Sequence, residues 1–358
     1  MKTTYIIAEA GVNHNGNEDM AFNLVDVAVE AGADAVKFQT FKAENLVTKS
    51  ADKAAYQKQT TDSAETHFEM LKRLELSHEL HSRLITYCKE KKIDFLSSAF
   101  DLDSLDFLVN ELKLKTLKIP SGEITNGPLL LAHARSGCNL ILSTGMSTLA
   151  EVEEALGVLA FGFISNKAIK PSKTSFHQAY LSIEGKSLLK ERVTILHCTT
   201  EYPSPIQEIN LNAILTMRSA FGLKVGYSDH SEGITVPIAA TAIGAVLIEK
   251  HFTLDKTLPG PDHKASLDPD DLYAMVKAIR AVEQAMGDGM KVPMPSELKN
   301  KPIARKSLTT TRNIKKGEKF TKDNITIKRP GMGISPMQYW HMLGETAKDN
   351  FGEDEVIK

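Results

Sequence analysis

The 358-residue sequence contains little cysteine, and its three cysteines are Cys88, Cys138 and Cys198. No two of them are spaced as a CxxC pair, and their number is odd. The sequence therefore predicts neither a disulfide framework nor a structural zinc site. We expect each cysteine to be a small buried side chain of the core.

The sequence also lacks a large excess of charge of either sign, because its 43 Lys and Arg nearly balance its 45 Asp and Glu and leave a formal net charge of −2. A protein held on nucleic acid or on an anionic membrane by its overall field needs a positive excess, so neither is an expected partner. No apolar run is long enough to span a bilayer, and no signal-peptide pattern follows Met1. The sequence predicts a cytoplasmic protein.

Short runs rich in Ile, Val and Leu alternate with longer amphipathic segments over the first 290 residues. This alternation is typical of parallel strands that are buried on both faces and connected by helices. We predict eight strands, the number that closes a TIM (β/α)8 barrel. They are 5–8, 35–38, 94–97, 116–119, 140–143, 194–197, 224–227 and 245–249.

Helix-end signals support this division of the chain. A helix over 19–31 ends at Gly32, one over 77–91 begins at a capping Ser77, and one over 148–159 follows Ser147 and Thr148. Two connections are longer than usual. The polar segment 40–75 follows the second strand on the side where such barrels build active sites, and we expect it to be a lid. Segment 161–192 lacks sustained periodicity and is predicted to be a surface insertion that faces away from the chemistry.

The amino-acid composition of the sequence changes near residue 290. Gly287 and Gly289 are followed by Pro293, Pro295 and Pro302 with Lys299 and Lys301, a composition typical of an extended linker. We therefore predict a barrel over 1–289, a linker over 290–303 and a small β-rich domain over 304–358, with strands at 307–310 and 325–328.

Polar side chains end nearly every predicted strand. In a parallel barrel these ends form the catalytic face, and charged groups placed there must be paired or desolvated. A purely structural barrel would not accumulate them, so the sequence predicts an active site. The side chains include Glu9, His14, Lys37, Gln39, Ser98, Lys118, Ser121, Glu123, Ser143, His197, Thr200, Ser228, His230, Glu249 and His251.

Lys37 and Lys118 could together bind one phosphate, because ammonium groups act as point charges toward it and nearby hydroxyls satisfy the remaining oxygens. The alternative is that each lysine only pairs with a carboxylate such as Glu9 or Glu123. A second candidate is a metal site at His230 and His251, which end neighbouring strands. Spacing alone does not distinguish this pair from His14 and His197, or a ligand from a structural histidine or a general base.

Nine sequence segments, in order along nearly the whole chain, resemble the motifs of the sialic acid synthase family. They are IIAEAGVNHNG (6–16), VKFQTF (36–41), KIPSGE (118–123), LSTGM (142–146), HCTTEYP (197–203), YSDH (227–230), EKHFT (249–253), PGPDH (259–263) and, in the tail, KRPG (328–331), which resembles the antifreeze-like SAF domain. Two positions depart from the family pattern: Thr200 replaces an Asn found in some members, and Ser98-Ala99 replaces Thr-Pro.

The resemblance implies a TIM barrel followed by a SAF domain, in a domain-swapped homodimer. It assigns catalytic roles to Glu9, Glu123, Lys37 and Lys118, and a divalent metal, Mn²⁺ or Mg²⁺, to His230 and His251. Phosphoenolpyruvate would be bound by Lys37, Gln39, Ser98, Lys118, Ser121, Ser143 and Ser228. The amino sugar would contact Glu123, Tyr202, Asp262 and, from the other subunit, Arg329.

The reaction implied by the resemblance condenses phosphoenolpyruvate with an N-acylated amino sugar and water, and releases phosphate by C–O cleavage. We expect N-acetylmannosamine as the acceptor and N-acetylneuraminic acid as the product. The alternatives are legionaminic acid formed from 2,4-diacetamido-2,4,6-trideoxymannose, and less favoured, pseudaminic acid formed from the altrose isomer. Two further alternatives are a Schiff-base aldolase with Lys118 as nucleophile, and a carbohydrate-binding or ice-binding module, which would account for the tail alone.

Overall fold

The structure is a computed structural model that describes residues 3–62, 64–165 and 169–358. The chain divides into two compact units, Met1–Gly287 and Asp288–Lys358, each described here by itself. No helix among the described residues combines the length and the apolar character of a membrane span. All three cysteines are buried and unpaired, as expected.

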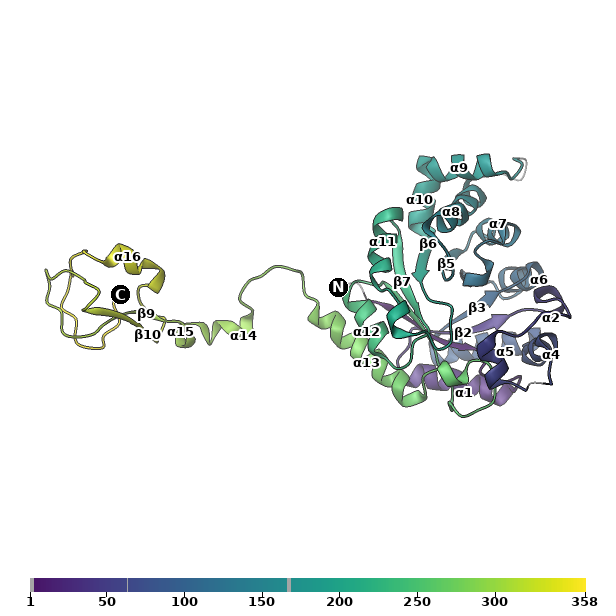
Figure 1. Ribbon diagram of the computed structural model, residues 1–358, viewed down its shortest axis with the longest axis horizontal. Helices are drawn as coiled ribbons and strands as arrows, with labels where there is room; N and C mark the ends of the chain where they lie inside the picture. Colours follow the sequence, from purple (N-terminus) through teal and green to yellow (C-terminus); the bar gives the residue numbers. More distant parts are fainter. Residues whose placement is uncertain (1–2, 63, 166–168) are drawn as a thin grey trace. The chain divides into compact units, whose positions relative to one another are not determined.

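The first unit is a closed barrel of eight parallel strands, in which each strand pairs with the next and β8 pairs with β1 (Figure 1). Every predicted strand is present. Most strands extend further at their carboxyl ends than predicted, since the polar residues there still take part in the ladder. The strands are β1 (Tyr5–Gly11), β2 (Ala35–Thr40), β3 (Asp94–Ala99), β4 (Thr116–Ile119), β5 (Asn139–Ser143), β6 (Val193–His197), β7 (Lys224–Asp229) and β8 (Leu247–His251).

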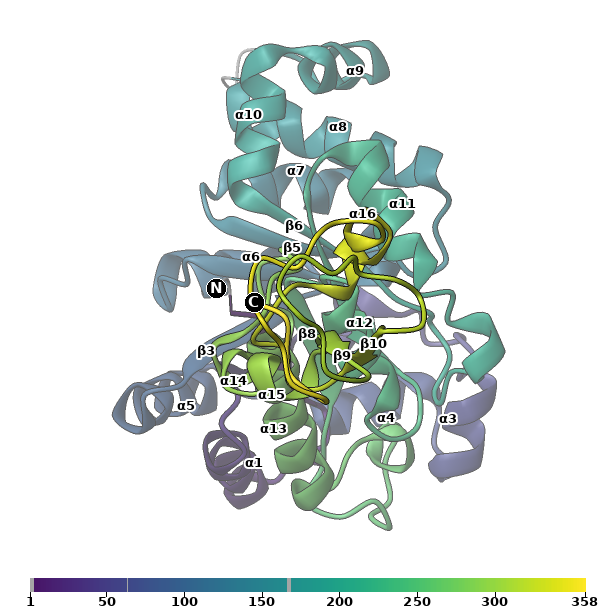
Figure 2. The ribbon, with the colours of Figure 1, turned by 90° about the vertical axis from the view of Figure 1, so that its left-hand side faces the viewer.

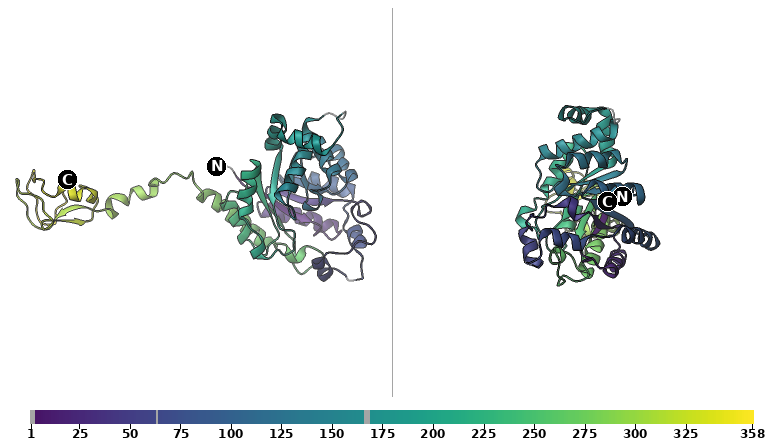
Figure 3. Two further views of the ribbon diagram at one scale, coloured as in Figure 1. Left: turned by 45° about the horizontal axis from the view of Figure 1, so that its top comes forward. Right: turned by 90° about the vertical axis from the view of Figure 1, so that its right-hand side faces the viewer.

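Helices surround the barrel and connect consecutive strands (Figure 3). Their first turns are capped as the sequence predicts: Ser77 accepts a hydrogen bond from Leu80 N, and Thr148 and Glu151 form a capping box. Gly32, after the first helix, adopts φ +78°. The helices are α1 (Glu18–Glu30), α5 (His78–Lys91), α6 (Leu102–Asp106) with η1 (Phe107–Glu111), α7 (Gly127–Arg135), α8 (Leu149–Ile164), α11 (Asn212–Phe221), α12 (Thr235–Ala242) and α13 (Pro269–Ala285).

A small apolar layer fills the inside of the barrel, separate from the larger core between strands and helices. Side chains two positions apart on a strand point to the same face, so the residues that follow this layer also point inward, toward the carboxyl ends of the strands. The layer therefore forms the floor beneath the predicted site residues. Its members Ile7, Ala35, Leu96, Ile141 and Leu247 precede, by two positions each, Glu9, Lys37, Ser98, Ser143 and Glu249.

Segment 161–192 is largely helical, although its sequence lacks sustained periodicity. Helix α8 continues to Ile164, and α9 (Lys173–Leu181) and α10 (Ile183–Arg192) follow (Figure 2). Serines at positions 172 and 182 cap these two helices, and Ala179 and Leu189 are buried in the core that contains α8. With so few buried side chains per helix, the periodicity in the sequence is weak. Residues 166–168 of the predicted insertion lie outside the described residues.

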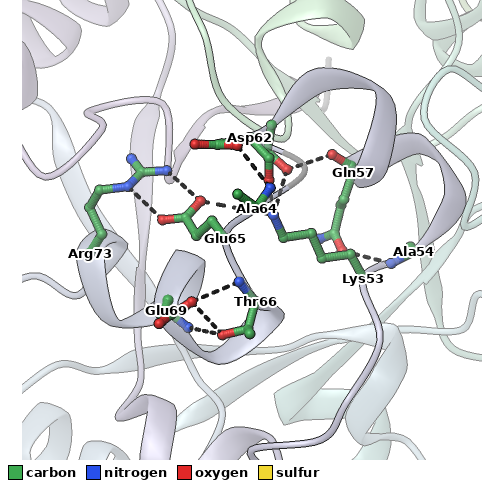
Figure 4. Close-up of polar contacts among 10 residues, drawn as sticks. Lys53, Ala54, Gln57, Asp62, Ala64, Glu65, Thr66, Glu69 and Arg73 are labelled. Carbon is green, nitrogen blue, oxygen red and sulfur yellow. Dashed lines mark hydrogen bonds and ion pairs between the residues drawn. The ribbon is translucent and has the colours of Figure 1, made fainter.

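Segment 40–75 contains three short helices, α2 (Ala43–Leu46), α3 (Ala55–Thr60) and α4 (His67–Leu74), and polar contacts hold it together (Figure 4). The buried Lys53 donates to the carbonyl oxygen of Asp62 at 2.7 Å. Arg73 pairs with Glu65 at 3.1 Å, and Thr66 forms a capping box with Glu69.

The second unit has an antiparallel pair, β9 (Ser307–Thr310) and β10 (Ile325–Lys328), at the predicted positions. Its own core is Leu308, Ile314, Phe320, Ile325, Ala347 and Ile357. It also contains η5 (Pro336–Gln338) and α16 (Tyr339–Met342). The expected linker is not extended throughout, because proline in the first turn begins two single-turn helices, α14 (Pro295–Leu298) and α15 (Lys301–Ala304).

Candidate active site

A pocket of about 260 Å³ lies at the carboxyl ends of the barrel strands. Polar side chains from seven strands and the loops after them line its base, while segment 40–75 contributes one wall. The pocket brings together fourteen of the residues predicted from the sequence: Glu9, Lys37, Gln39, Ser98, Lys118, Ser121, Ser143, Thr200, Tyr202, Ser228, His230, Glu249, His251 and Asp262.

Two lysines and two glutamates form the base of this pocket, and all four side chains are buried. Lys37 contacts Glu9 in a close ion pair and lies 3.7 Å from Glu249 Oε2. Lys118 Nζ lies 3.1 Å from Glu249 Oε1. Both lysines therefore pair with carboxylates, as the alternative interpretation expects, although the partner of Lys118 is Glu249 rather than Glu123.

Burial and charge act in opposite directions on these carboxyl groups. Burial raises the pKa of Glu9 to about 7, even though Lys37 lowers it. Burial would also raise the pKa of Glu249, but the ammonium groups of Lys118 and Lys37 outweigh it and lower the pKa. Burial alone would lower the pKa of Lys37, yet Glu249 and Glu9 raise it. Glu9 is thus the group able to exchange a proton near neutral pH, while Glu249 stays an anion.

Hydroxyl groups stand around this charged base. Ser98 accepts a hydrogen bond from Lys37 at 3.2 Å, and Ser228 donates to Glu249 at 3.0 Å. Ser121 accepts from Gly145 N at 3.0 Å. The buried Ser143 Oγ has no hydrogen-bond partner among the described residues. An anion with several oxygens would find both cations and hydroxyl donors here.

Gly11, at the end of strand β1, leaves space for neighbouring side chains of the site. The residue has φ +52° at a bulge in the β1–β2 ladder. A Cβ atom there would lie 3.3 Å from both Glu9 and His251 and 3.4 Å from Gln39. The glycine therefore leaves space at the point where three site residues meet.

His230 and His251 lie side by side, with ring centroids 5.7 Å apart, and the ring of Tyr202 lies 4.2 Å from that of His230. Burial lowers the pKa of His230 to about 4, and that of His251 well below its usual value. His230 Nδ1 donates to the Thr199 carbonyl oxygen at 2.6 Å, which leaves the lone pair on Nε2. His251 Nδ1 is buried and has no hydrogen-bond partner in the described part of the chain.

Two neutral imidazoles with available lone pairs fit a divalent cation whose other positions are filled by water or substrate oxygens. Among the described residues, no cluster of three or more His, Cys, Asp or Glu side chains is placed to hold a metal. His14 and His197 do not line this pocket: His14 Nδ1 bonds to Gly16 N at 2.9 Å, and His197 Nε2 bonds to Ile209 O at 2.7 Å. The geometry favours His230 and His251 as the pair.

Two predicted site residues are not brought to the pocket within the barrel unit. Glu123, in η2 (Ser121–Glu123), accepts a hydrogen bond from Asn126 at 2.7 Å and is not a lining residue. Arg329 belongs to the second unit, where its exposed side chain donates to Ala304 O at 3.0 Å. Asp262, beside η4 (His263–Ala265), does line the pocket, and burial raises its pKa to about 6.

Glu249 is a site residue that our assignment of roles missed. It was named only as a strand-end side chain; it lies two positions before His251 on β8 and therefore shares the inward face. The residues of segment 40–75 that face the pocket had no comparable signal, since a loop has no periodicity from which a facing side can be predicted.

Comparisons with known proteins show which family the chain belongs to. The NeuB family model matches residues 24–291, and the SAF domain model matches 305–358. The chain is 49% identical to the N,N'-diacetyllegionaminic acid synthase of Campylobacter jejuni, with 100% of both chains covered. It is 45% identical to the synthase of the same name from Legionella pneumophila, covering 99% of this chain and 93% of the relative.

A solved structure supports the fold. The N-acetylneuraminic acid synthetase of Leptospira borgpetersenii, in complex with citrate, is 32% identical, with a TM-score of 0.66 over 83% of this chain and 90% of that one. The chain belongs to the NeuB family and carries a C-terminal SAF domain.

Proposed function

We propose that this enzyme condenses phosphoenolpyruvate with 2,4-diacetamido-2,4,6-trideoxymannose and water to form N,N'-diacetyllegionaminic acid and phosphate. The observation that carries the proposal is the buried base of Lys37, Lys118, Glu9 and Glu249 in the same pocket as two histidines whose pKa values burial lowers. The acceptor we expected from the sequence, N-acetylmannosamine, is less well supported, because the relatives of 49% and 45% identity are named legionaminic acid synthases.

Phosphoenolpyruvate carries a carboxylate and a phosphate, and the base of the pocket offers two ammonium groups to them. In this proposal Lys37 and Lys118 bind these groups together with Gln39 and the serine hydroxyls at positions 98, 121, 143 and 228. Glu249 holds both lysines in place through its ion pairs. The fixed charges then favour the anion without reorganising when it arrives.

The reaction forms a bond from C3 of phosphoenolpyruvate to the aldehyde carbon of the open-chain sugar, whose oxygen takes up a proton. Water adds at C2, and phosphate leaves as the C2–O bond breaks. Glu9 is placed to give or take the proton during water addition, because its pKa is raised toward neutrality. A divalent cation held by His230 and His251 would supply Lewis-acid polarisation of the aldehyde.

The remaining sugar contacts are assigned to Glu123, Tyr202 and Asp262, with Arg329 donated by the second subunit of a homodimer. A Schiff-base mechanism is disfavoured, since Lys118 Nζ lies 3.1 Å from Glu249 Oε1 in an ion pair and is not free to attack a carbonyl carbon.

One phosphate-release assay tests the proposal with three acceptors: the diacetamido mannose sugar, its altrose isomer and N-acetylmannosamine, each with and without Mn²⁺. We expect the highest kcat/KM with the first sugar. Higher turnover of another sugar would refute the acceptor, and borohydride trapping of a pyruvate adduct would refute the mechanism. Elemental analysis of purified His230→Ala protein tests the cation separately, because full metal occupancy in that variant would contradict the assignment.

A further inference from the structure

One wall of the active-site pocket is apolar, although the segment that forms it is polar. Segment 40–75 contains many charged and hydroxyl side chains, most of which are exposed. The residues that it contributes to the pocket lining are different in character, for they are Leu46, Gln57, Met70, Leu71 and Leu74. Four of the five are apolar, so the side of the segment that lines the pocket is mainly apolar although most of its charged side chains are exposed.

This wall is the partly exposed side of a small hydrophobic cluster that is separate from the barrel core. Val12, Phe41, Met70 and Leu74 are buried in the cluster. Leu46, Leu71 and Phe100 pack on it but keep part of their surface exposed, and all three line the pocket. A purely structural cluster would need no such exposed face. We call Leu46, Leu71 and Phe100 the apolar wall.

The position of the wall fixes which part of a sugar it can contact. The aldehyde carbon C1 must lie at the base, where it meets phosphoenolpyruvate near Lys37 and His251. In an open-chain sugar C6 is the carbon farthest from C1. It therefore extends away from the strand ends toward the loops, where segment 40–75 stands.

We propose that the apolar wall binds the C6 methyl group of the acceptor and selects 6-deoxy sugars over sugars with a C6 hydroxyl. This inference rests on the proposed function. A hydroxyl placed against Leu46 and Leu71 would lose its hydration without gaining a partner, whereas a methyl group gains contact with them. Gln57 is the one polar side chain among the pocket-lining residues of the described part of segment 40–75.

The experiment uses two acceptor pairs that differ only at C6. One pair is 2,4-diacetamido-2,4,6-trideoxymannose and its 6-hydroxy counterpart, and the other is 2-acetamido-2,6-dideoxymannose and N-acetylmannosamine. We expect kcat/KM of the full-length enzyme to favour the 6-deoxy member by about 10- to 100-fold, the range over which an apolar site discriminates such groups. A ratio near one in every pair that turns over would overturn the inference.

Variants of the apolar wall then test whether its side chains cause the preference for 6-deoxy sugars. Leu46→Asn and Leu71→Asn change the chemistry at nearly constant size and should lower the C6 ratio to within a few-fold of one, with the KM for phosphoenolpyruvate unchanged. Leu71→Met keeps an apolar surface and should retain the ratio, which guards against loss of folding in the Asn variant. Leu181→Asn, at an exposed position on α9, is the matched control.

The outcomes separate the two proposals. If N-acetylmannosamine is used better than the diacetamido sugar, the proposed acceptor is wrong, yet a preference for its 6-deoxy analogue would still support the wall. If the diacetamido sugar is preferred but the Asn variants keep the wild-type C6 ratio, the function stands and the wall does not. No phosphate release with any acceptor would overturn both.

Discussion

Lys250 Nζ lies 2.6 Å from Asp229 Oδ2, and both side chains are fully buried. The two residues are directly opposite one another in the β7–β8 ladder, and each is the immediate neighbour of a candidate metal ligand, His251 or His230. Because successive side chains on a strand alternate in direction, the ion pair lies behind the strands while the histidines face the pocket. Asp229 also accepts hydrogen bonds from Tyr227 and Ser231. This buried network holds together the two strands that present the histidines.

Lys250→Met should destabilise the barrel by about 3–5 kcal/mol, because it leaves Asp229 buried without its counter-charge. Urea unfolding at equilibrium measures the loss. The double variant Asp229→Leu/Lys250→Met removes both charges and should recover part of it. If the double variant is less stable than the single one, the two side chains do not act as a compensating pair.

Glu249→Gln should weaken the ligand-free protein but increase its stabilisation by phosphoenolpyruvate. The substitution removes the anion shared by Lys37 and Lys118, so two buried ammonium groups lose part of their compensation. The negative charges of bound phosphoenolpyruvate would then replace the missing charge of the Glu249 carboxylate. The measurement is Tm with and without phosphoenolpyruvate, because a ligand that binds only the folded state raises it.

The exposed Glu232→Gln provides a control of identical chemistry outside the pocket. It should leave both Tm values close to those of the wild type. An equal phosphoenolpyruvate-induced rise in Tm for the wild type and Glu249→Gln would mean that the base of the pocket does not bind the anion.

His133 should make the barrel less stable in mild acid. Burial lowers the pKa of this histidine to about 4, despite the hydrogen bond of Nδ1 with the Leu129 carbonyl oxygen. In the unfolded chain its pKa is near 6.5. Between these values the unfolded state binds more protons, so the unfolding free energy falls as pH decreases from about 6.5 to 4, by roughly 1 kcal/mol per pH unit.

Urea midpoints at pH 7 and pH 5 test this dependence. His133→Gln keeps a polar side chain that does not titrate, so the difference between the two midpoints should shrink. His177→Gln, at an exposed position on α9, should keep the wild-type difference. A pH dependence unchanged by His133→Gln would show that other groups control acid stability.

The barrel could be predicted from the sequence because its strands are buried on both faces and read as short apolar runs. The two strands of the second unit, 307–310 and 325–328, could also be predicted from the sequence and have the predicted bounds. Helices α9 and α10 were not predicted, since Ala179 in α9 and Gly185 and Leu189 in α10 are the only buried residues of these helices and leave the sequence pattern mostly polar. Their identification needed the serine caps to be weighed above periodicity.

The candidate site divides in the same way. Residues at strand ends, such as Lys37 and His251, were predictable because the topology places all eight ends on one face. Glu249 was named among them, but its role as the shared ion-pair partner of both lysines was not predicted. Leu46 and Leu71 could not be assigned to the pocket, because which side of segment 40–75 faces the substrate is decided by tertiary packing on Phe41 and Met70.

The proposed role of Arg329 across a dimer predicts complementation between two inactive variants. Lys118→Ala destroys the phosphoenolpyruvate site of its own barrel, while Arg329→Ala would spoil the site of the partner subunit. In a mixed dimer the barrel of the Arg329→Ala chain keeps Lys118 and receives an intact Arg329. Random reassociation of equal amounts should therefore restore about a quarter of the wild-type activity, because half of the dimers are mixed and each has one complete site.

The measurement is phosphate release after the two proteins are unfolded and refolded together. A mixture of Lys37→Ala and Lys118→Ala proteins is the control, because both changes lie in the barrel and no mixed dimer contains a complete site. If the Arg329→Ala mixture is no more active than the average of its two parents, Arg329 does not act on the partner's site.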